Sequence, residues 1–160
     1  MGQEPRLSPQ QTEDVRLGEL NNSLGFLVRV AQVRVYDQFY ERFGADDLRP
    51  GEFSMLWVMH LNPGIKRGIL AQTLRIKPAH MTKAVRRLED QGLIEREIPD
   101  HDRRSVLLRL TGKGEGFVAA NKRNFFGENA YNTHGLSAEE AETLAHLLKR
   151  YVGLETEERI

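Results

Sequence analysis

The sequence predicts a mostly helical protein with a small β-wing, in which a winged helix-turn-helix lobe is joined to a helical dimerisation region built from both chain ends. Three observations predict this fold class. Apolar residues three or four apart mark two short helices between residues 67 and 91. Runs of strand-forming residues at 93–98 and 105–110, separated by a polar turn, then predict a hairpin. Apolar stripes near both chain ends predict the remaining helices.

A proline separates the two short helices. Pro78 fixes its own φ and disfavours helical conformation at the residue before it. We therefore expect Lys77 to cap the second helix and Pro78 to be its first residue, with the turn at 75–77. Each helix has one apolar face, and the residues that form these faces are Leu70, Ala71, Leu74 and Ile76 before the turn and Met81, Val85 and Leu88 after it.

The hairpin follows the second helix directly. Gly92 provides the left-handed conformation with which many helices end, and alternating side chains from Leu93 to Ile98 are typical of a strand. The run 99–104 is polar and turn-forming, and the β-branched and aliphatic residues of 105–110 fit a paired strand. The sequence therefore predicts a wing with a basic tip.

Two motifs in this segment resemble a known family. The first motif begins with Asp102-x-Arg104 and, after five residues, continues with Leu110-Thr111-x-x-Gly114. This pattern resembles the wing signature D-x-R-x(5)-L-T-x-x-G of the MarR family of bacterial transcription regulators. The segment 88–94, Leu-Glu-x-x-Gly-Leu-Ile, resembles the family's connection between recognition helix and wing. The sharp motifs occupy 70–114, and the likeness in layout runs from about residue 17 to the C-terminus. The chain departs from the family at Arg75, where the turn often has glycine, and at 78–80, where small hydroxyl residues are common.

The chain ends supply the other predicted helices. A helix from Leu17 to Phe43 has two apolar stripes, which suit either a central core helix or, as the resemblance implies, a helix shared with a second subunit. Pro50 is expected to open the next helix, and the resemblance implies a short strand near Ile65. We expect Thr111 to cap a helix through Phe125, and a capping box at 137–140 to begin the last helix. The predicted organisation is a flexible arm (1–16), a dimerisation helix (17–48), a DNA-binding lobe (49–114) and C-terminal dimerisation helices (115–160).

Charge is distributed unevenly along a chain whose net charge is zero. Residues 66–113 hold 12 Lys/Arg and 6 Asp/Glu, a net charge of +6, and the rest of the chain has a net charge of −6. A local basic surface matters more for binding phosphates than the global total. The absence of cysteine, of a long apolar span and of an apolar signal-peptide core predicts a protein of the cytoplasm, without a membrane partner.

The predicted partner of the basic surface is double-stranded DNA. In the recognition helix we expect His80, Lys83 and Thr82 to face base edges, and Lys77, Arg86 and Arg87 to face phosphates. The resemblance implies that an arginine of the wing enters the minor groove. Arg104 is at the signature position and Arg103 is its neighbour, and Asp102 is expected to orient the loop through its carboxylate.

Catalysis, metal binding and cofactor binding receive no support from the sequence. The five histidines include no pair at a helical spacing of three or four, and cysteine ligands are absent. The chain also has no nucleophile elbow, no H-E-x-x-H motif and no phosphate-binding glycine loop. We therefore predict a protein that is not an enzyme, with no metal site and no cofactor.

The resemblance also implies a small anionic or aromatic effector, bound between the dimerisation helices and the DNA-binding lobe. Aromatic acids or their coenzyme A thioesters are the expected class. The alternative for the aromatic candidates is an ordinary place in the core. The candidate residues, chosen by composition and location, are Arg29, Arg34, Tyr36, Tyr40, Trp57 and His60.

Together these features predict a homodimeric, ligand-responsive transcription regulator that binds a palindromic operator. Repression is the expected mode, because occlusion of a promoter requires only binding. The alternative is a winged-helix protein-interaction module whose basic face meets an acidic partner. A steep salt dependence and a preference for one palindrome over bulk DNA distinguish the two.

Overall fold

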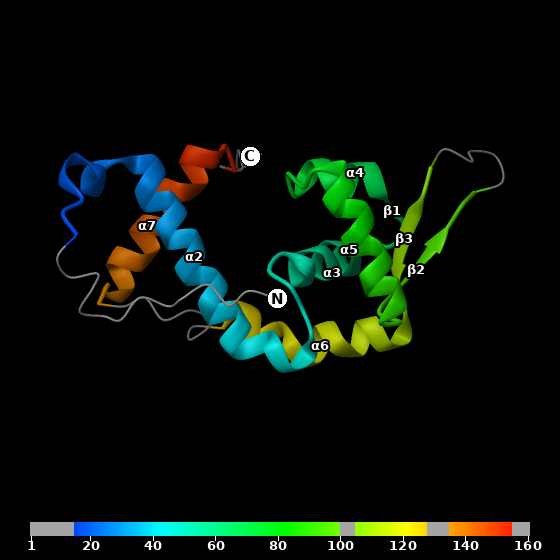
Figure 1. Cartoon of the computed structure of the whole chain (residues 1–160). Coiled ribbons are helices and arrows are strands. Elements are labelled where there is room, and N and C mark those ends of the chain that lie inside the picture. Colours follow the sequence, from blue (N-terminus) through cyan, green and yellow to red (C-terminus); the bar gives the residue numbers. More distant parts are fainter. Residues whose placement is uncertain (1–14, 100–104, 128–134, 155–160) are drawn as a thin grey trace, which may run out of the picture.

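The computed structural model describes residues 15–99, 105–127 and 135–154. Helices from the two chain ends lie on one side of the molecule and a lobe with a small sheet lies on the other (Figure 1). This arrangement confirms the predicted fold class of a mostly helical protein with a small β-wing. In chain order the elements are η1 (Gly18–Asn22), α2 (Leu24–Phe43), η2 (Gly44–Asp46), α3 (Glu52–Leu61), β1 (Ile65–Lys66), α4 (Arg67–Thr73), α5 (Pro78–Asp90), β2 (Ile94–Glu97), β3 (Leu107–Leu110), α6 (Gly112–Phe126) and α7 (Ala138–Val152).

Two predicted helix starts were wrong, one by seven residues and the other by two. The helix expected from Leu17 begins at Leu24, because Gly18 has a φ of 54° and the segment after it forms a 3-10 turn. Ser23 is extended and separates that turn from α2. The helix expected at Pro50 begins two residues later, since Gly51 adopts a φ of 88° as its N-cap.

The core crosses the predicted domain limits. Phe39 and Phe43, at the end of α2, are 3% and 2% exposed and belong to the same buried cluster as residues of α3, α5 and the sheet. The Phe43 ring lies 5.9 Å from Phe53 of α3, and Phe53 stacks on Phe125 of α6 at 4.5 Å between centroids. The lobe is therefore built around the ends of two helices that also extend beyond it.

The helix-turn-helix forms as the sequence predicts. Lys77 is the N-cap of α5 and Pro78 is its first residue, while α4 ends at Thr73. Arg75, which replaces a common glycine, has a φ of 53°. A non-glycine residue in this left-handed region costs about 1 to 2 kcal/mol. Gly92, with a φ of 71°, follows α5 as predicted.

The sheet has the order β1-β3-β2, and both pairs are antiparallel. The register places Ile94 opposite Leu110, and Ile65 opposite Leu108. The third strand implied by the family resemblance is therefore present as β1. The second wing strand is shorter than predicted, since it begins at Leu107 and not at residue 105.

The L-T-x-x-G motif forms the junction between the wing and α6. The Thr111 hydroxyl accepts a hydrogen bond from Gly114 N at 3.1 Å, which caps α6, and donates to the Gly92 carbonyl at 2.7 Å. A Cβ at Gly114 would lie 2.0 Å from the Leu93 carbonyl oxygen. The motif therefore lets α6 begin in direct contact with the chain that leads into β2.

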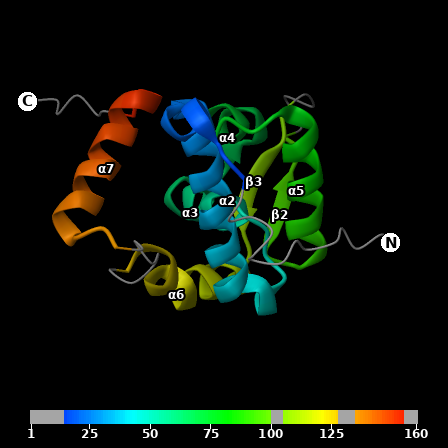
Figure 2. The ribbon, with the colours of Figure 1, turned by 60° about the vertical axis from the view of Figure 1, so that its left-hand side comes forward.

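The helices at the chain ends keep large apolar surfaces exposed. Before Phe39 the side chains of both predicted stripes of α2 are exposed except for the half-buried Phe26, and α7 has no buried residue. Figure 2 shows α7 standing apart from α2. The capping box between Ser137 and Glu140 is present. Within the described residues, no helix has the length and apolar character needed to cross a bilayer.

Candidate nucleic-acid interface

The recognition helix α5 has one buried face and one exposed basic face. Met81, Val85 and Leu88 are buried, which turns the opposite side of the helix toward solvent. Pro78 and Ala79, the first two residues of α5, carry no long side chain. The exposed face bears the predicted candidates Lys77, His80, Thr82, Lys83 and Arg86.

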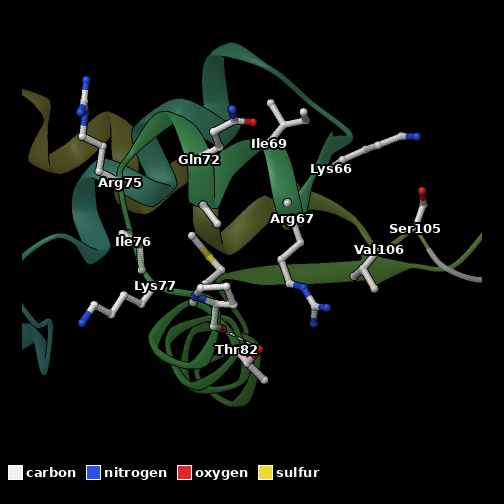
Figure 3. Close-up of a pocket in the computed structure, with 14 residues that line it drawn as sticks. Lys66, Arg67, Ile69, Gln72, Arg75, Ile76, Lys77, Thr82, Ser105 and Val106 are labelled. Atoms are coloured by element: carbon white, nitrogen blue, oxygen red, sulfur yellow. Dashed lines mark hydrogen bonds between the residues drawn. The ribbon is translucent and has the colours of Figure 1, made fainter. Parts of the chain in front are cut away.

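Thr82 differs from the other exposed candidates because part of its hydrogen-bonding capacity is used within the helix. Its hydroxyl donates to the Pro78 carbonyl at 3.0 Å (Figure 3). The oxygen keeps lone pairs that can accept a hydrogen bond, while the proton is engaged. This arrangement suits acceptance from a base amino group better than donation to a base.

Arg87 has a different partner from the phosphate that we expected. Its Nε donates to Oε1 of Glu52 at 3.0 Å, and its Nη1 donates to Oδ2 of Asp47 at 3.1 Å. Glu52 is the first residue of α3 and is only 4% exposed. A buried carboxylate is costly unless it is paired and hydrogen-bonded, and the Arg87 side chain, which is 21% exposed, supplies this partner. Sequence reasoning missed this role because the two residues are 35 positions apart.

A cavity of about 640 Å³ lies beside the N-terminus of α5. Its walls come from α4, the turn, the start of α5 and the base of the wing (Figure 3). Four cationic residues line it, Lys66, Arg67, Arg75 and Lys77, and its lining includes no carboxylate. Its lining also contains apolar side chains such as Ile76. The cavity extends the basic surface of the recognition helix toward the wing.

Lys66 and Arg67 in this cavity were not among the predicted site residues. In the sequence they can be recognised only as two adjacent basic residues at the start of a short helix. In the structure they lie where β1 passes into α4. The strand fixes their position, since Arg67 N donates to the Val106 carbonyl at 2.9 Å. Without knowledge of β1, nothing in the sequence placed this pair beside the recognition helix.

The described part of the wing carries two arginines that are paired with carboxylates. Arg96 Nε donates to Glu89 at 2.8 Å, and Arg109 lies 3.5 Å from Glu97. Neither was predicted as a DNA contact. The predicted wing residues Asp102, Arg103 and Arg104 lie outside the described residues.

A second cavity, of about 760 Å³, separates α2 from the recognition helix. Tyr36 lines it from α2, and Lys77, His80 and Lys83 line it from the other side. Glu52, which is paired with Arg87, is also part of its lining. The cavity therefore has a strongly cationic wall formed by residues that also belong to the exposed face of α5.

The six predicted effector residues do not gather in one cavity, although the Trp57 and His60 rings lie 5.5 Å apart. Of the six, only Tyr36 lines the cavity between α2 and α5. Trp57 and His60 lie elsewhere, against α6: the Trp57 ring is 4.7 Å from Phe126, and His60 Nδ1 is 2.6 Å from Glu115. The remaining three are exposed on α2 and line none of the described cavities: Arg29, Arg34 and Tyr40.

The histidine and carboxylate side chains are dispersed in the described ranges. Nowhere in 15–99, 105–127 and 135–154 do three or more of them form a group that could hold a metal ion. The polar chemistry of the site is therefore that of cations and hydrogen-bonding groups on the recognition helix and around the two cavities.

The sequence of the chain is similar to those of known proteins. The family model described as "MarR family" matches residues 48–106. A putative transcriptional regulatory protein for the hcr operon of Thauera aromatica is 31% identical over 134 residues, which cover 83% of this chain and 81% of that protein.

Solved structures of transcription regulators are also similar to this chain. The transcriptional repressor CouR bound to a 23-mer DNA duplex is 30% identical, with a TM-score of 0.78 over 87% of this chain and 99% of that one. CouR bound to p-coumaroyl-CoA is 28% identical, with a TM-score of 0.76 over 89% and 100%. The helix-turn-helix, the three-stranded wing and these relatives show that the chain belongs to the MarR family of transcription regulators.

Proposed function

We propose that the protein is a homodimeric repressor that binds a palindromic operator and is released from it by an aromatic acid or its coenzyme A thioester. The observation that carries the proposal is the exposed cationic face of α5 beside a cavity that Lys66, Arg67 and Lys77 line and whose lining includes no carboxylate. Such a surface attracts phosphates and presents an α-helix to the major groove. A regulator of this kind acts where the chromosome is, which in bacteria is the cytoplasm.

Within the interface, each predicted side chain except Arg87 has a role. His80, Thr82 and Lys83 read base edges from the first half of α5, and Lys77 and Arg86 contact phosphates. Arg67, and Lys66 beside it, extend the phosphate contacts toward the wing. Arg103 and Arg104 act at the wing tip, and Asp102 orients it. Arg87 is left out, since its guanidinium is held by Glu52.

Dimerisation follows from the exposed apolar surfaces of α2 and α7. Leu147 and Tyr151 of α7 are 51% and 66% exposed in the single chain. Contiguous apolar surface of this kind is unfavourable in water unless a partner covers it. A second copy brings an identical surface, and two-fold symmetry then presents two recognition helices to half-sites about 34 to 36 Å apart.

The effector proposal rests on the cavity between α2 and α5. Its volume of about 760 Å³ is in the range of sites for small organic ligands, and its cationic wall suits carboxylates and phosphates. CouR, a structural relative, binds p-coumaroyl-CoA. A ligand here contacts the dimerisation helix and the recognition helix together. It releases DNA to the extent that it binds better to a state in which the helices no longer match the operator.

DNA binding is tested with a duplex selected by the protein from a random pool. We expect a palindrome, and an affinity that falls steeply with salt, because several phosphates are neutralised. Inserting about five base pairs between half-sites turns one of them to the opposite face of the duplex and should abolish tight binding. Equal affinity for bulk DNA and the selected duplex would favour the protein-interaction alternative.

The effector is tested by titrating p-coumaroyl-CoA, free p-coumarate and coenzyme A into the complex with the selected duplex. We expect the thioester or the free acid to release DNA. Tyr36→Ala should weaken the response by about tenfold, the effect of losing one well-packed aromatic contact. Tyr40→Ala is the matched control, because Tyr40 lies on the same helix but lines none of the described cavities. Equal responses from the two variants would contradict this location of the site.

A further inference from the structure

The turn of the helix-turn-helix is hydrogen-bonded to the C-terminal helix. Arg75 Nη2 donates to the carbonyl of Val152 at 3.1 Å, across 77 residues of sequence. Val152 is the last residue of α7, and Gly153 after it has a φ of 70°. A residue of the DNA-binding lobe therefore contacts the end of a helix that belongs to the other side of the molecule.

The acceptor is well suited to a guanidinium. The last carbonyls of an α-helix have no partner within the helix, and they carry the negative end of the helix dipole. The amides of Gly153 and Leu154 turn back to Arg150 and Lys149 and satisfy two of these carbonyls. Arg75 supplies a charged donor to the Val152 carbonyl that follows them.

The backbone conformation of Arg75 is unusual for a residue with a side chain. Its φ of 53° lies in the left-handed region, where glycine is favoured. A long cationic side chain at a strained backbone position points to a role for that side chain. In the structure the side chain reaches α7, which a glycine cannot do.

The contact between Arg75 and α7 lies at the end of the lobe opposite its aromatic junction with α2 and α6. The aromatic core of Phe43, Phe53 and Phe125 joins the lobe to α2 and α6. In Figure 1 that junction lies near α6 at the bottom, whereas α4 and the C-terminal end of α7 lie at the top. A lobe held only at the aromatic junction is free to pivot about it. The contact at Arg75 holds the opposite end of the lobe.

We propose that Arg75 is a positioning residue, which fixes the orientation of the helix-turn-helix relative to α7 and thereby the half-site spacing that the dimer accepts. The turn moves with the recognition helix, because Arg75 N and Ile76 N donate to Gln72 and Ala71 of α4 while Lys77 caps α5. This proposal rests on the proposed palindromic operator.

The test compares three variants of the full chain. Arg75→Gly removes the side chain and suits the left-handed backbone, so the turn should fold. Arg75→Lys keeps a cation of similar reach that can still donate to a carbonyl. Arg67→Ala removes another cation from the cavity that Arg75 also lines, and among the described residues the Arg67 side chain makes no hydrogen bond or ion pair with α7. Each is titrated with the duplex selected by the unchanged protein and with duplexes whose half-sites are one base pair closer or farther apart, at several salt concentrations.

We expect Arg75→Gly to reduce the discrimination between spacings by about tenfold while the slope of log affinity against log salt stays unchanged. Arg75→Lys should restore part of the discrimination. Arg67→Ala should do the reverse, with a slope shallower by about 1 and intact discrimination. A shallower slope for Arg75→Gly with intact discrimination would make Arg75 a phosphate contact and overturn the proposal.

Hydrogen exchange without DNA tests the contact independently of the operator. In Arg75→Gly the amides of Gly153 and Leu154 should exchange about fivefold faster, the factor that corresponds to one net hydrogen bond. Unchanged exchange would overturn the role of Arg75. If the unchanged protein shows no spacing preference while exchange responds as expected, the palindromic operator is wrong and the contact itself is supported.

Discussion

Arg87 Nε lies 3.0 Å from Oε1 of Glu52, and this ion pair joins the recognition helix to the first residue of α3. The Glu52 carboxylate also accepts from Arg49 N at 2.8 Å, so it is held by groups from two segments. Arg86, the neighbour of Arg87, is exposed. Two adjacent arginines of one helix therefore have different environments. Arg87 stabilises the fold, whereas Arg86 is accessible to a binding partner.

The first prediction separates these two arginines. Arg87→Ala leaves the buried Glu52 carboxylate without its partner and should destabilise the fold by about 3 kcal/mol, with little change in the salt slope of DNA binding. Arg86→Ala should leave stability nearly unchanged and make the slope shallower by about 1. Urea unfolding and fluorescence anisotropy measure the two effects. Wild-type stability with a shallower slope in Arg87→Ala would restore our original assignment of Arg87 to a phosphate.

The second prediction concerns two glycines of α6. Gly114→Ala places a Cβ 2.0 Å from the Leu93 carbonyl oxygen and should cost more than about 2 kcal/mol, because backbone must move. Gly116→Ala, two residues later, has nothing within 4 Å of its Cβ and should stabilise the helix by about 0.5 to 1 kcal/mol. Thermal unfolding compares the pair, and similar melting temperatures would show that the close approach at Gly114 is not required.

The third prediction tests the residues of the wing tip, whose roles are inferred from the sequence. Arg104→Ala should weaken operator binding by about 1 to 3 kcal/mol and make the salt slope shallower by about 1, with the dimer intact. Asp102→Ala removes no positive charge, so any loss of affinity should leave the slope nearly unchanged. Wild-type affinity and slope for Arg104→Ala, in a protein that remains dimeric, would rule out a wing contact at this residue.

The fourth prediction concerns the apolar face of α7. Leu147→Glu puts a charge into the proposed subunit interface and should weaken the dimer by at least about 3 kcal/mol, since the lost burial counts once in each subunit. Lys149→Glu changes the charge by more but falls on the other side of the helix, and it should leave the dimer nearly intact. Sedimentation equilibrium measures both. An unaffected dimer in Leu147→Glu would move the interface away from this face.

Elements with a local signal were predictable from the sequence. Pro78 and Gly92 mark the limits of α5, and Ser137 with Glu140 marks the start of α7, because each acts within one turn of the chain. The hairpin was also predictable, although its strands were expected to be longer. The exposed face of α5 followed from the spacing of its three buried residues.

Features that depend on distant pairing were not predictable. Nothing near Arg87 indicates that a carboxylate 35 positions away takes up its guanidinium. Tyr36 and Trp57 are both aromatic residues near the lobe, yet one lines the cavity beside α5 and the other packs on Phe126. Composition alone cannot tell such positions apart, because the distinction depends on how α2 and α3 are each rotated against the rest of the lobe.

The burial of Phe39 and Phe43 inside the lobe bears on the design of hybrid regulators. A DNA-reading segment cut at residues 49 and 114 would leave behind Phe43 and Phe125, whose rings pack around Phe53. The excised segment would expose Phe53, and the recipient protein would have to supply rings of matching shape. Exchange of operator preference between relatives is therefore expected to succeed when the last turns of α2 and the whole of α6 travel with the transplanted segment, or when only the solvent-facing side chains of α5 are exchanged.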